Sequence, residues 1–285
     1  MRRPLHLSKA ASKSGLSRRL AMALVRITVM LIIGIFIYFK LFEHRLIFYP
    51  ESTIAGVPGI PYEEISFKAL DGTDLNAWLI PFEGSPRIFV VSHGNAGNIG
   101  DRWAMGEYLH NEFQSTVFMY DYRGYGRSQG QPTESGLYSD LRGATRYVRS
   151  RGFAAEHIYL VGQSLGTAVT LDVASQEQVA GILLEAPFPS VSALARAYTF
   201  SVPFDYFWTS RFDSLSKLRS IRVPVAVVHG TKDPLIPFAL GQQVFDAAHE
   251  PKRLFAVEAE IHEGALMALG LERTGELRRF LFREQ

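Results

Sequence analysis

The sequence has 285 residues, of which 47% are hydrophobic and 20% charged, so the chain is long and apolar enough to form a substantial core. The first 26 residues hold seven of the 30 basic residues and none of the 28 acidic ones, which leaves the rest acidic on balance. An acidic remainder argues against a nucleic-acid-binding surface on the folded part. There is no cysteine, which excludes disulfides, a cysteine nucleophile and thiolate metal sites.

The N-terminal region combines this basic flank with a long apolar segment, LAMALVRITVMLIIGIFIYFKLF, at residues 20–42. As a helix its apolar part is about 30 Å long, enough to cross a bilayer, and Arg26 lies close enough to the basic flank to snorkel toward it. Basic flanks stay in the cytoplasm. We therefore predict a basic cytoplasmic tail at 1–19, a single-pass transmembrane signal anchor at 20–42, and a folded domain at 43–285 on the periplasmic, lumenal or extracellular side.

Two other interpretations of the apolar segment fit the sequence less well. A cleavable signal peptide needs small residues after its apolar core, whereas YFKLFEHRLIF follows here. A buried core helix of a soluble cytosolic protein does not need a run of basic residues before it. A chain that proved soluble without detergent would favour this second alternative.

Beyond the anchor, short apolar runs alternate with helical patterns. The stretch EEISFKALDGTDLNAWLIP predicts two strands joined around Asp71 and Gly72. Further strands are expected in RIFVVS, TVFMY, HIYLVG, GILLEA, VPVAVV and RLFAVEA, with helices at 101–112, 139–151, 164–175, 237–248 and 264–282. Buried strands that alternate with helices indicate an α/β fold with a mostly parallel sheet of about eight strands and helices on both faces.

One block, residues 187–219, lies outside this alternation and is rich in aromatic residues. These aromatic residues are Phe200, Phe204, Tyr206, Phe207 and Trp208. The block follows one strand and precedes another, so it can lie over the C-terminal edge of the sheet. It is either additional core or a small cap that shapes an apolar pocket.

The sequence LVGQSLGTA places Ser164 between Gly162 and Gly166. A Gly-x-Ser-x-Gly pentapeptide is a weak signal alone, but this one follows a predicted strand and opens a predicted helix. That is the setting of a nucleophile elbow, a tight turn that needs glycine on both sides of the serine. The helix N-terminus also offers backbone N–H groups to a developing negative charge. Ser164 is therefore the candidate nucleophile.

A serine nucleophile needs a base and an acid that orients the base. In an elbow fold the chain order is serine, acid, histidine, with the histidine after the last strand, and among the eight histidines only His262 fits this order cleanly. Asp233, just beyond the strand VPVAVV, is the candidate acid, while Asp213 and Asp246 are poorer choices. The plainer alternatives are an exposed loop histidine and an Asp-Pro turn.

An oxyanion hole needs two N–H donors aimed at the reacting oxygen. The candidates are the N–H of Leu165, directly after the nucleophile, and the N–H of Asn95 in the loop SHGNAGN. His93 in the same loop is interpreted as a structural residue. We expect neither a metal nor a cofactor, because the sequence has no HExxH motif and no phosphate-binding glycine motif, and the pair His262-Glu263 alone does not make a metal site.

Taken together, these motifs resemble the α/β-hydrolase superfamily and, within it, the BEM46-like branch of membrane-anchored serine hydrolases. The resemblance covers about residues 43–270 and rests on EHRLIFYP, SHGNAGNIGDR, DYRGYGRSQGQPTESGLYSD, GQSLG, HGTKDPLIP and the late histidine. It implies an α/β-hydrolase fold and an esterase or thioesterase activity, with Ser164, Asp233 and His262 as the triad. Two positions depart from the pattern. Relatives often have arginine in place of Gln163 and glycine in place of Ile261.

We therefore expect a membrane-anchored serine hydrolase that cleaves a carboxylic ester or thioester through an acyl-enzyme on Ser164. The expected substrate is a small-molecule ester or thioester, or an acylated molecule near the bilayer. Two alternatives remain open: a peptidase or amidase of the same fold, and a non-enzymatic anchored interaction protein that has kept the fold.

Overall fold

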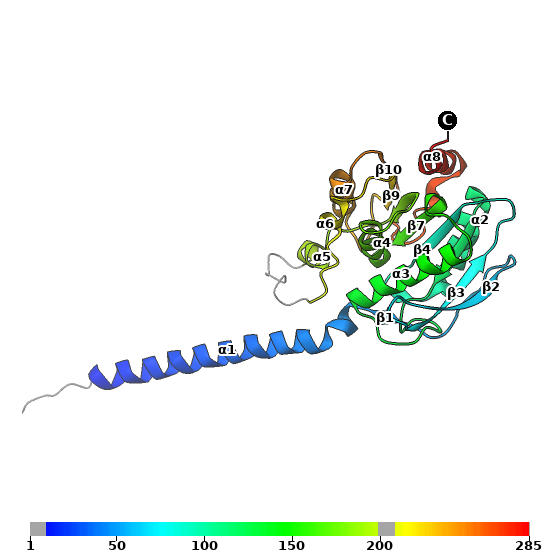
Figure 1. Cartoon of the computed structure of the whole chain (residues 1–285). Coiled ribbons are helices and arrows are strands. Elements are labelled where there is room, and N and C mark those ends of the chain that lie inside the picture. Colours follow the sequence, from blue (N-terminus) through cyan, green and yellow to red (C-terminus); the bar gives the residue numbers. More distant parts are fainter. Residues whose placement is uncertain (1–9, 199–208, 285) are drawn as a thin grey trace, which may run out of the picture.

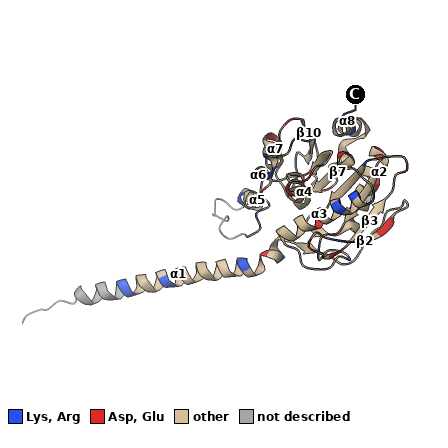
Figure 2. Ribbon diagram, viewed as in Figure 1, with Lys and Arg blue, Asp and Glu red and all other residues tan. Residues whose placement is uncertain are grey.

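The computed structural model describes residues 10–198 and 209–284, and it consists of a compact domain from which one long helix projects (Figure 1). That helix, α1, runs from Ala10 to Ile47. Within the described residues it is the one helix long and apolar enough to cross a membrane, over Arg18–Tyr38, where the mean hydropathy is 2.6 and no part is buried. Figure 2 shows the uncharged stretch between Arg26 and Lys40. Membrane anchors and signal sequences both have a helix of this length and composition near the N-terminus.

The central sheet has eight strands in the order β10-β9-β8-β7-β4-β6-β3-β2. Only the pairs β2–β3 and β3–β6 are antiparallel, so the mostly parallel sheet predicted from the sequence is confirmed. The strands are β2 Glu63–Lys68, β3 Asp74–Ile80, β4 Ile88–Ser92, β6 Thr116–Tyr120, β7 Ile158–Gln163, β8 Gly181–Glu185, β9 Val225–Gly230 and β10 Lys252–Val257. A separate two-residue pairing joins β1 (Tyr49–Pro50) to β5 (Ala96–Gly97).

Helices cover both faces of the sheet, also as predicted. One face carries α2 (Trp103–Phe113) and α8 (Leu271–Phe282). The other face carries α3 (Glu134–Ser150), α4 (Leu165–Ala174), α6 (Ser214–Leu218) and α7 (Phe238–Ala247), with α5 (Val191–Tyr198) at its margin. Short 3-10 turns lie at Ile99–Asp101, Ala155–His157 and Met267–Leu269.

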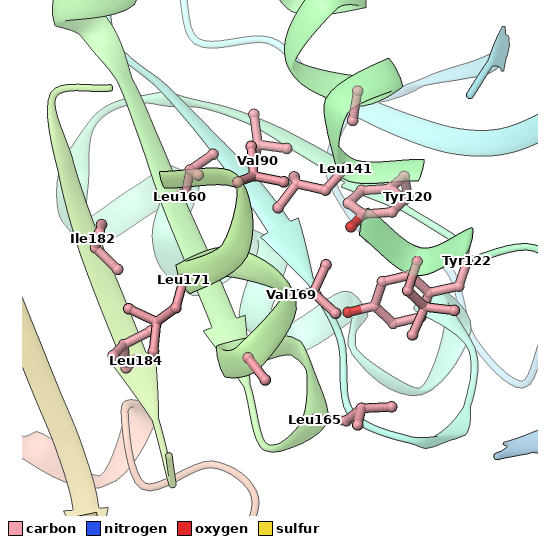
Figure 3. Close-up of a cluster of buried hydrophobic side chains, with 14 of the residues drawn as sticks. Val90, Tyr120, Tyr122, Leu141, Leu160, Leu165, Val169, Leu171, Ile182 and Leu184 are labelled. Carbon is pink, nitrogen blue, oxygen red and sulfur yellow. The ribbon is translucent and has the colours of Figure 1, made fainter. Parts of the chain in front are cut away.

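Helix α4 crosses the middle of the sheet and is buried from Leu165 to Val173. Figure 3 shows Leu165, Val169 and Leu171 of α4 packed among strand and helix side chains. These neighbours include Val90, Leu160, Ile182 and Leu184 from the strands and Leu141 from α3. The tight packing fixes the N-terminus of α4, which is the part that positions the predicted nucleophile.

Two predicted helix boundaries are wrong. The last helix begins at Leu271 and not at Gly264, because Gly264 and Gly270 have φ of +86° and +76° and interrupt the helical path. Helix α3 begins at Glu134, before the predicted start at Ser139. There the side chain of Thr133 accepts the N–H of Gly136 and caps the helix.

The block at 187–219 contributes α5 and α6, but its five predicted aromatic residues lie in 199–208, outside the described residues. Two carboxylates hold the chain at residues 209–212. Glu43 of α1 accepts the N–H groups of Thr209 and Ser210, and Glu134 of α3 accepts that of Phe212. This block is therefore tied to both α1 and α3.

Candidate active site

Ser164 lies at the turn between β7 and α4, with φ 51° and ψ −117°. A positive φ in a residue other than glycine is strained, and such strain is typical of functional turns. The flanking glycines make the turn possible. A Cβ on Gly162 would lie 2.5 Å from the carbonyl oxygen of Gly166, and a Cβ on Gly166 would lie 2.0 Å from that of Ser92. The local geometry is therefore that of a nucleophile elbow.

The structure brings together the three residues predicted as a triad. His262, in the loop after β10, has its Nε2 3.1 Å from Ser164 Oγ. Its Nδ1 lies 2.8 Å from Oδ2 of Asp233, which follows β9. A carboxylate accepts hydrogen bonds only, so Nδ1 donates to it and Nε2 is left to accept the proton of the serine hydroxyl. This is the tautomer that a serine nucleophile needs.

The carboxylate of Asp233 is held by several donors. Its Oδ1 accepts the backbone N–H groups of Leu235 and Ile236 at 2.8 and 2.9 Å. Burial raises the pKa of this carboxyl, but hydrogen bonds from His229, His262 and the two backbone groups outweigh burial and bring its pKa well below the usual value. Asp233 is therefore ionised at neutral pH, as an acid that orients a histidine must be.

Asn95, predicted as an oxyanion donor, is held by the last residue of α1, by β1 and by Tyr125. Its side-chain amide donates to the carbonyl of Ile47 at 3.0 Å. Its own carbonyl accepts the N–H of Tyr49 at 2.9 Å and the hydroxyl of Tyr125 at 2.8 Å. The other predicted donor, Leu165, is the first residue of α4, where a backbone N–H has no partner within its own helix.

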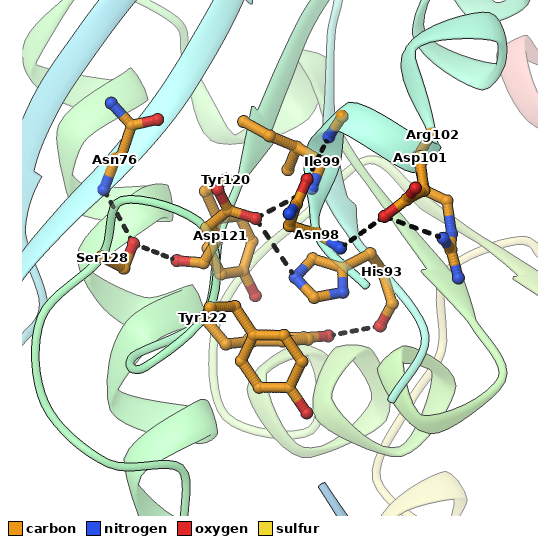
Figure 4. Close-up of polar contacts among 12 residues, drawn as sticks. Asn76, His93, Asn98, Ile99, Asp101, Arg102, Tyr120, Asp121, Tyr122 and Ser128 are labelled. Atoms are coloured by element: carbon orange, nitrogen blue, oxygen red, sulfur yellow. Dashed lines mark hydrogen bonds and ion pairs between the residues drawn. The ribbon is translucent and has the colours of Figure 1, made fainter. Parts of the chain in front are cut away.

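A second polar cluster contains His93, which belongs to the same loop as Asn95, together with Asp121 and Arg102 (Figure 4). His93 Nδ1 donates to the carbonyl of Gly94, and its Nε2 lies 3.7 Å from Oδ1 of Asp121. Burial, assisted by the charge of Arg102, lowers the pKa of His93 to about 3, while burial raises the pKa of Asp121 to about 7. His93 is therefore neutral and serves as a structural residue, in agreement with its interpretation from the sequence.

Ser164, His262, Asn95 and Leu165 all line one cavity of about 330 Å³. The remaining lining is mostly apolar and comes from the end of α1, the loop after β8, α5 and the loop after β9: Leu46, Ile47, Phe188, Val191, Leu194, Ala195, Tyr198, Leu235 and Ile236. The cavity suits an apolar group held next to the serine hydroxyl.

The match to known proteins agrees with this geometry. A family model for the alpha/beta hydrolase fold matches residues 87–214. The uncharacterized protein YfhR of Escherichia coli is 32% identical over 221 residues, which cover 74% of this chain and 76% of YfhR. The chain belongs to the α/β-hydrolase superfamily.

Other members of this superfamily extend the comparison. Alpha/beta hydrolase domain-containing protein 17C of Xenopus laevis is 33% identical over 208 residues, 70% of this chain and 63% of that protein, in accord with the resemblance to the BEM46-like branch. The esterase Pf2001 of Pyrococcus furiosus is similar in structure, with a TM-score of 0.67 at 20% identity, over 82% of this chain and 98% of that one. The α/β-hydrolase fold predicted from the sequence is confirmed.

Sequence reasoning missed several polar residues around the site of this α/β-hydrolase. His229 lies 3.3 Å from Asp233 Oδ2. Arg102, Gln163 and Glu185 form a buried chain of hydrogen bonds behind the elbow. Two sequence signals concern His229 and Gln163. A His-Gly pair follows β4 directly and another ends β9, and Gln163 stands where the resemblance leads one to expect arginine.

Proposed function

We propose that this chain is a serine hydrolase that cleaves carboxylic esters or thioesters through an acyl-enzyme on Ser164. The observation that carries the proposal is the unbroken line from Ser164 Oγ to His262 Nε2, at 3.1 Å, and from His262 Nδ1 to Asp233, at 2.8 Å, beside an apolar cavity. The esterase Pf2001, which shares the fold, is in keeping with it.

The mechanism follows from these contacts. His262 takes the hydroxyl proton as Ser164 Oγ attacks the carbonyl carbon of the substrate, and the tetrahedral intermediate collapses when His262 returns the proton to the leaving alcohol or thiol. Water then attacks the carbonyl carbon of the acyl-enzyme while His262 takes its proton; the bond to Ser164 Oγ breaks, the carboxylic acid leaves, and His262 returns the proton to Ser164. Asp233 holds the ring of His262 and stabilises its charged form.

The developing oxyanion is placed opposite the N–H groups of Leu165 and Asn95. Leu165 contributes through the open N-terminus of α4, and Asn95 through a loop whose position is fixed by Ile47, Tyr49 and Tyr125. Loss of one such donor costs about 10²–10³ in rate.

The substrate side of the proposal rests on the cavity and on α1. The apolar lining favours an acyl chain. Helix α1 supports an uncleaved anchor, because the helix continues into the domain and supplies Leu46 and Ile47 to the cavity. The basic residues before it favour residues 1–19 as a cytoplasmic tail and a translocated domain. Within the block 187–219 predicted as a cap, α5 acts as one, because it contributes Val191, Leu194, Ala195 and Tyr198 to that cavity.

Covalent labelling with a fluorophosphonate probe tests the nucleophile. Wild type should label and Ser164→Ala should not, while the exposed control Ser150→Ala labels as wild type does. Equal labelling of wild type and Ser164→Ala contradicts Ser164 as the nucleophile, whereas no labelling of either protein counts against a hydrolase and in favour of an interaction protein. A series of p-nitrophenyl esters of rising chain length tests the pocket, and indifference to acyl length contradicts an acyl site. Faster turnover of matched p-nitroanilides would favour a peptidase or amidase.

A further inference from the structure

Arg102 is a cation that lies almost fully inside the domain, with 7% of it exposed, at the start of α2. Its Nε donates to Oε1 of Gln163 at 2.9 Å. Its Nη2 donates to Oε1 of Glu263 at 2.5 Å and to the carbonyl of Ala96 at 3.3 Å. One guanidinium therefore joins three segments that are far apart in the sequence.

Each of these three acceptors is the immediate chain neighbour of a group that the proposed mechanism uses. In chain order those groups are Asn95, Ser164 and His262. A buried cation with a purely structural role needs compensating acceptors, but it does not need them next to the oxyanion donor, the nucleophile and the base. Because all three acceptors of Arg102 adjoin such groups, the geometry indicates that Arg102 fixes the relative positions of these groups.

Glu185, at the end of β8, extends the connection. Its Oε2 accepts the side-chain N–H of Gln163 at 2.8 Å, and its Oε1 accepts the N–H of Leu266, in the His262 loop, at 2.8 Å. Its carbonyl accepts the N–H of Ser164 at 2.9 Å. The turn that carries Ser164 and the loop that carries His262 are thus joined twice, once through Arg102 and once through Glu185.

We propose that Arg102 is a positioning residue that holds the oxyanion loop, the nucleophile elbow and the His262 loop in their reactive arrangement. The inference rests on the proposed function, because it takes Ser164 and His262 as reacting groups. The planar guanidinium suits the task, since its fixed fork donates in several directions at once, whereas a lysine ammonium on a flexible stem does not reproduce that geometry. Because Arg102 does not line the cavity, its loss should leave substrate binding intact.

The test is steady-state kinetics of full-length protein in detergent with p-nitrophenyl butyrate, with rates expressed per site titrated by the fluorophosphonate probe. Arg102→Gln should lower kcat by about 10²-fold, the cost of a misplacement of about 1 Å, with KM changed less than about threefold. Arg102→Lys should recover only part of kcat. Arg142→Gln is the matched control, because Arg142 is also a largely buried arginine paired with a carboxylate, that of Asp172, away from the site. It should lower thermal stability without lowering kcat per titrated site.

Glu263 supplies a second arm that does not depend on the folding of Arg102 variants, because its side chain is 48% exposed. Glu263→Ala should lower kcat less than Arg102→Gln does, and adding it to Arg102→Gln should cause little further loss. Losses that multiply, or an unchanged kcat per titrated site in Arg102→Gln, would overturn the inference. Labelling that persists in Ser164→Ala would instead defeat the proposed function, so the two failures are distinguishable.

Discussion

His229 Nε2 lies 3.3 Å from Oδ2 of Asp233, the same oxygen that accepts the hydrogen bond from His262. His229 is fully buried, its Nε2 also lies 2.9 Å from the carbonyl of Ile236, and Gly241 of α7 packs against its ring. Asp233 is therefore held between two histidines, one from β9 and one from the loop after β10. The second histidine restricts the direction in which the carboxylate can point.

This arrangement predicts that His229 affects catalysis through Asp233. His229→Leu removes the donor, so the carboxylate is free to turn away from His262, and kcat should fall about tenfold, equivalent to about 1.4 kcal/mol of barrier. His229→Gln keeps an N–H donor and should retain more activity. His249→Ala changes an exposed histidine and serves as the control.

The same control also tests the choice of His262 as the base. If His249→Ala lowered kcat as much as His262→Ala does, that choice would be wrong.

The triad itself should behave as a unit. Ser164→Ala and His262→Ala should each lower kcat by about 10⁶-fold, and Asp233→Ala should be milder, at about 10⁴-fold. The double variant Ser164→Ala/His262→Ala should be no slower than either single variant, because each already disables the same step. Kinetics with an activated ester measure all four proteins. If the fold-losses in kcat of the two single variants multiplied in the double variant, these residues would act independently.

The elbow glycine predicts a packing effect. A Cβ at position 166 would lie 2.0 Å from the carbonyl oxygen of Ser92, and this contact is with backbone that cannot easily move. Gly166→Ala should therefore lower the free energy of unfolding by about 3 kcal/mol or more and lower activity. Gly275→Ala, in α8, meets only the end of the Arg279 side chain at 3.6 Å and should raise stability by about 0.5–1 kcal/mol. Urea unfolding of both variants checks the contrast.

Asp121 predicts a pH effect on stability. Burial raises its pKa from the ordinary 3.8 to about 7, so the folded state binds a proton more tightly than the unfolded state does. Its contribution to stability is complete below about pH 4 and is lost as the pH rises toward 7, by up to about 1.4 kcal/mol per pH unit. Asp121→Asn resembles the protonated form and should remove this slope. Measuring the free energy of unfolding of wild type and Asp121→Asn from pH 4 to 8 tests this prediction. Parallel curves for the two proteins would contradict the pH effect assigned to Asp121.

The cavity wall predicts a change in selectivity. Leu194 of α5 lines the cavity, so Leu194→Trp should fill part of it. The kcat/KM for p-nitrophenyl decanoate should then fall about tenfold or more relative to that for p-nitrophenyl acetate. Leu271→Trp, on an exposed side chain, is the control. An unchanged ratio in Leu194→Trp would mean that the acyl chain lies elsewhere.

The sheet and the meeting of the predicted site residues could be predicted because they depend on local signals. Buried strands alternate with helices, and the carboxyl ends of parallel strands bring Ser164, Asp233 and His262 to one edge of the sheet. The supporting contacts could not be predicted in the same way. Whether Arg102 reaches Glu263 depends on how loops pack in three dimensions, which no local pattern encodes. The start of the last helix depended on the positive φ of two glycines.

The end of α1 has one further consequence. Ile47 is the last residue of the helix, and it also lines the cavity and accepts the hydrogen bond of Asn95. No flexible linker therefore separates α1 from the domain. Inserting one residue into α1 would rotate the part of the helix before the insertion by roughly 100° relative to the cavity mouth. Proteolytic removal of α1 together with Ile47 would take away one wall of the cavity and the carbonyl that accepts the side-chain amide of Asn95.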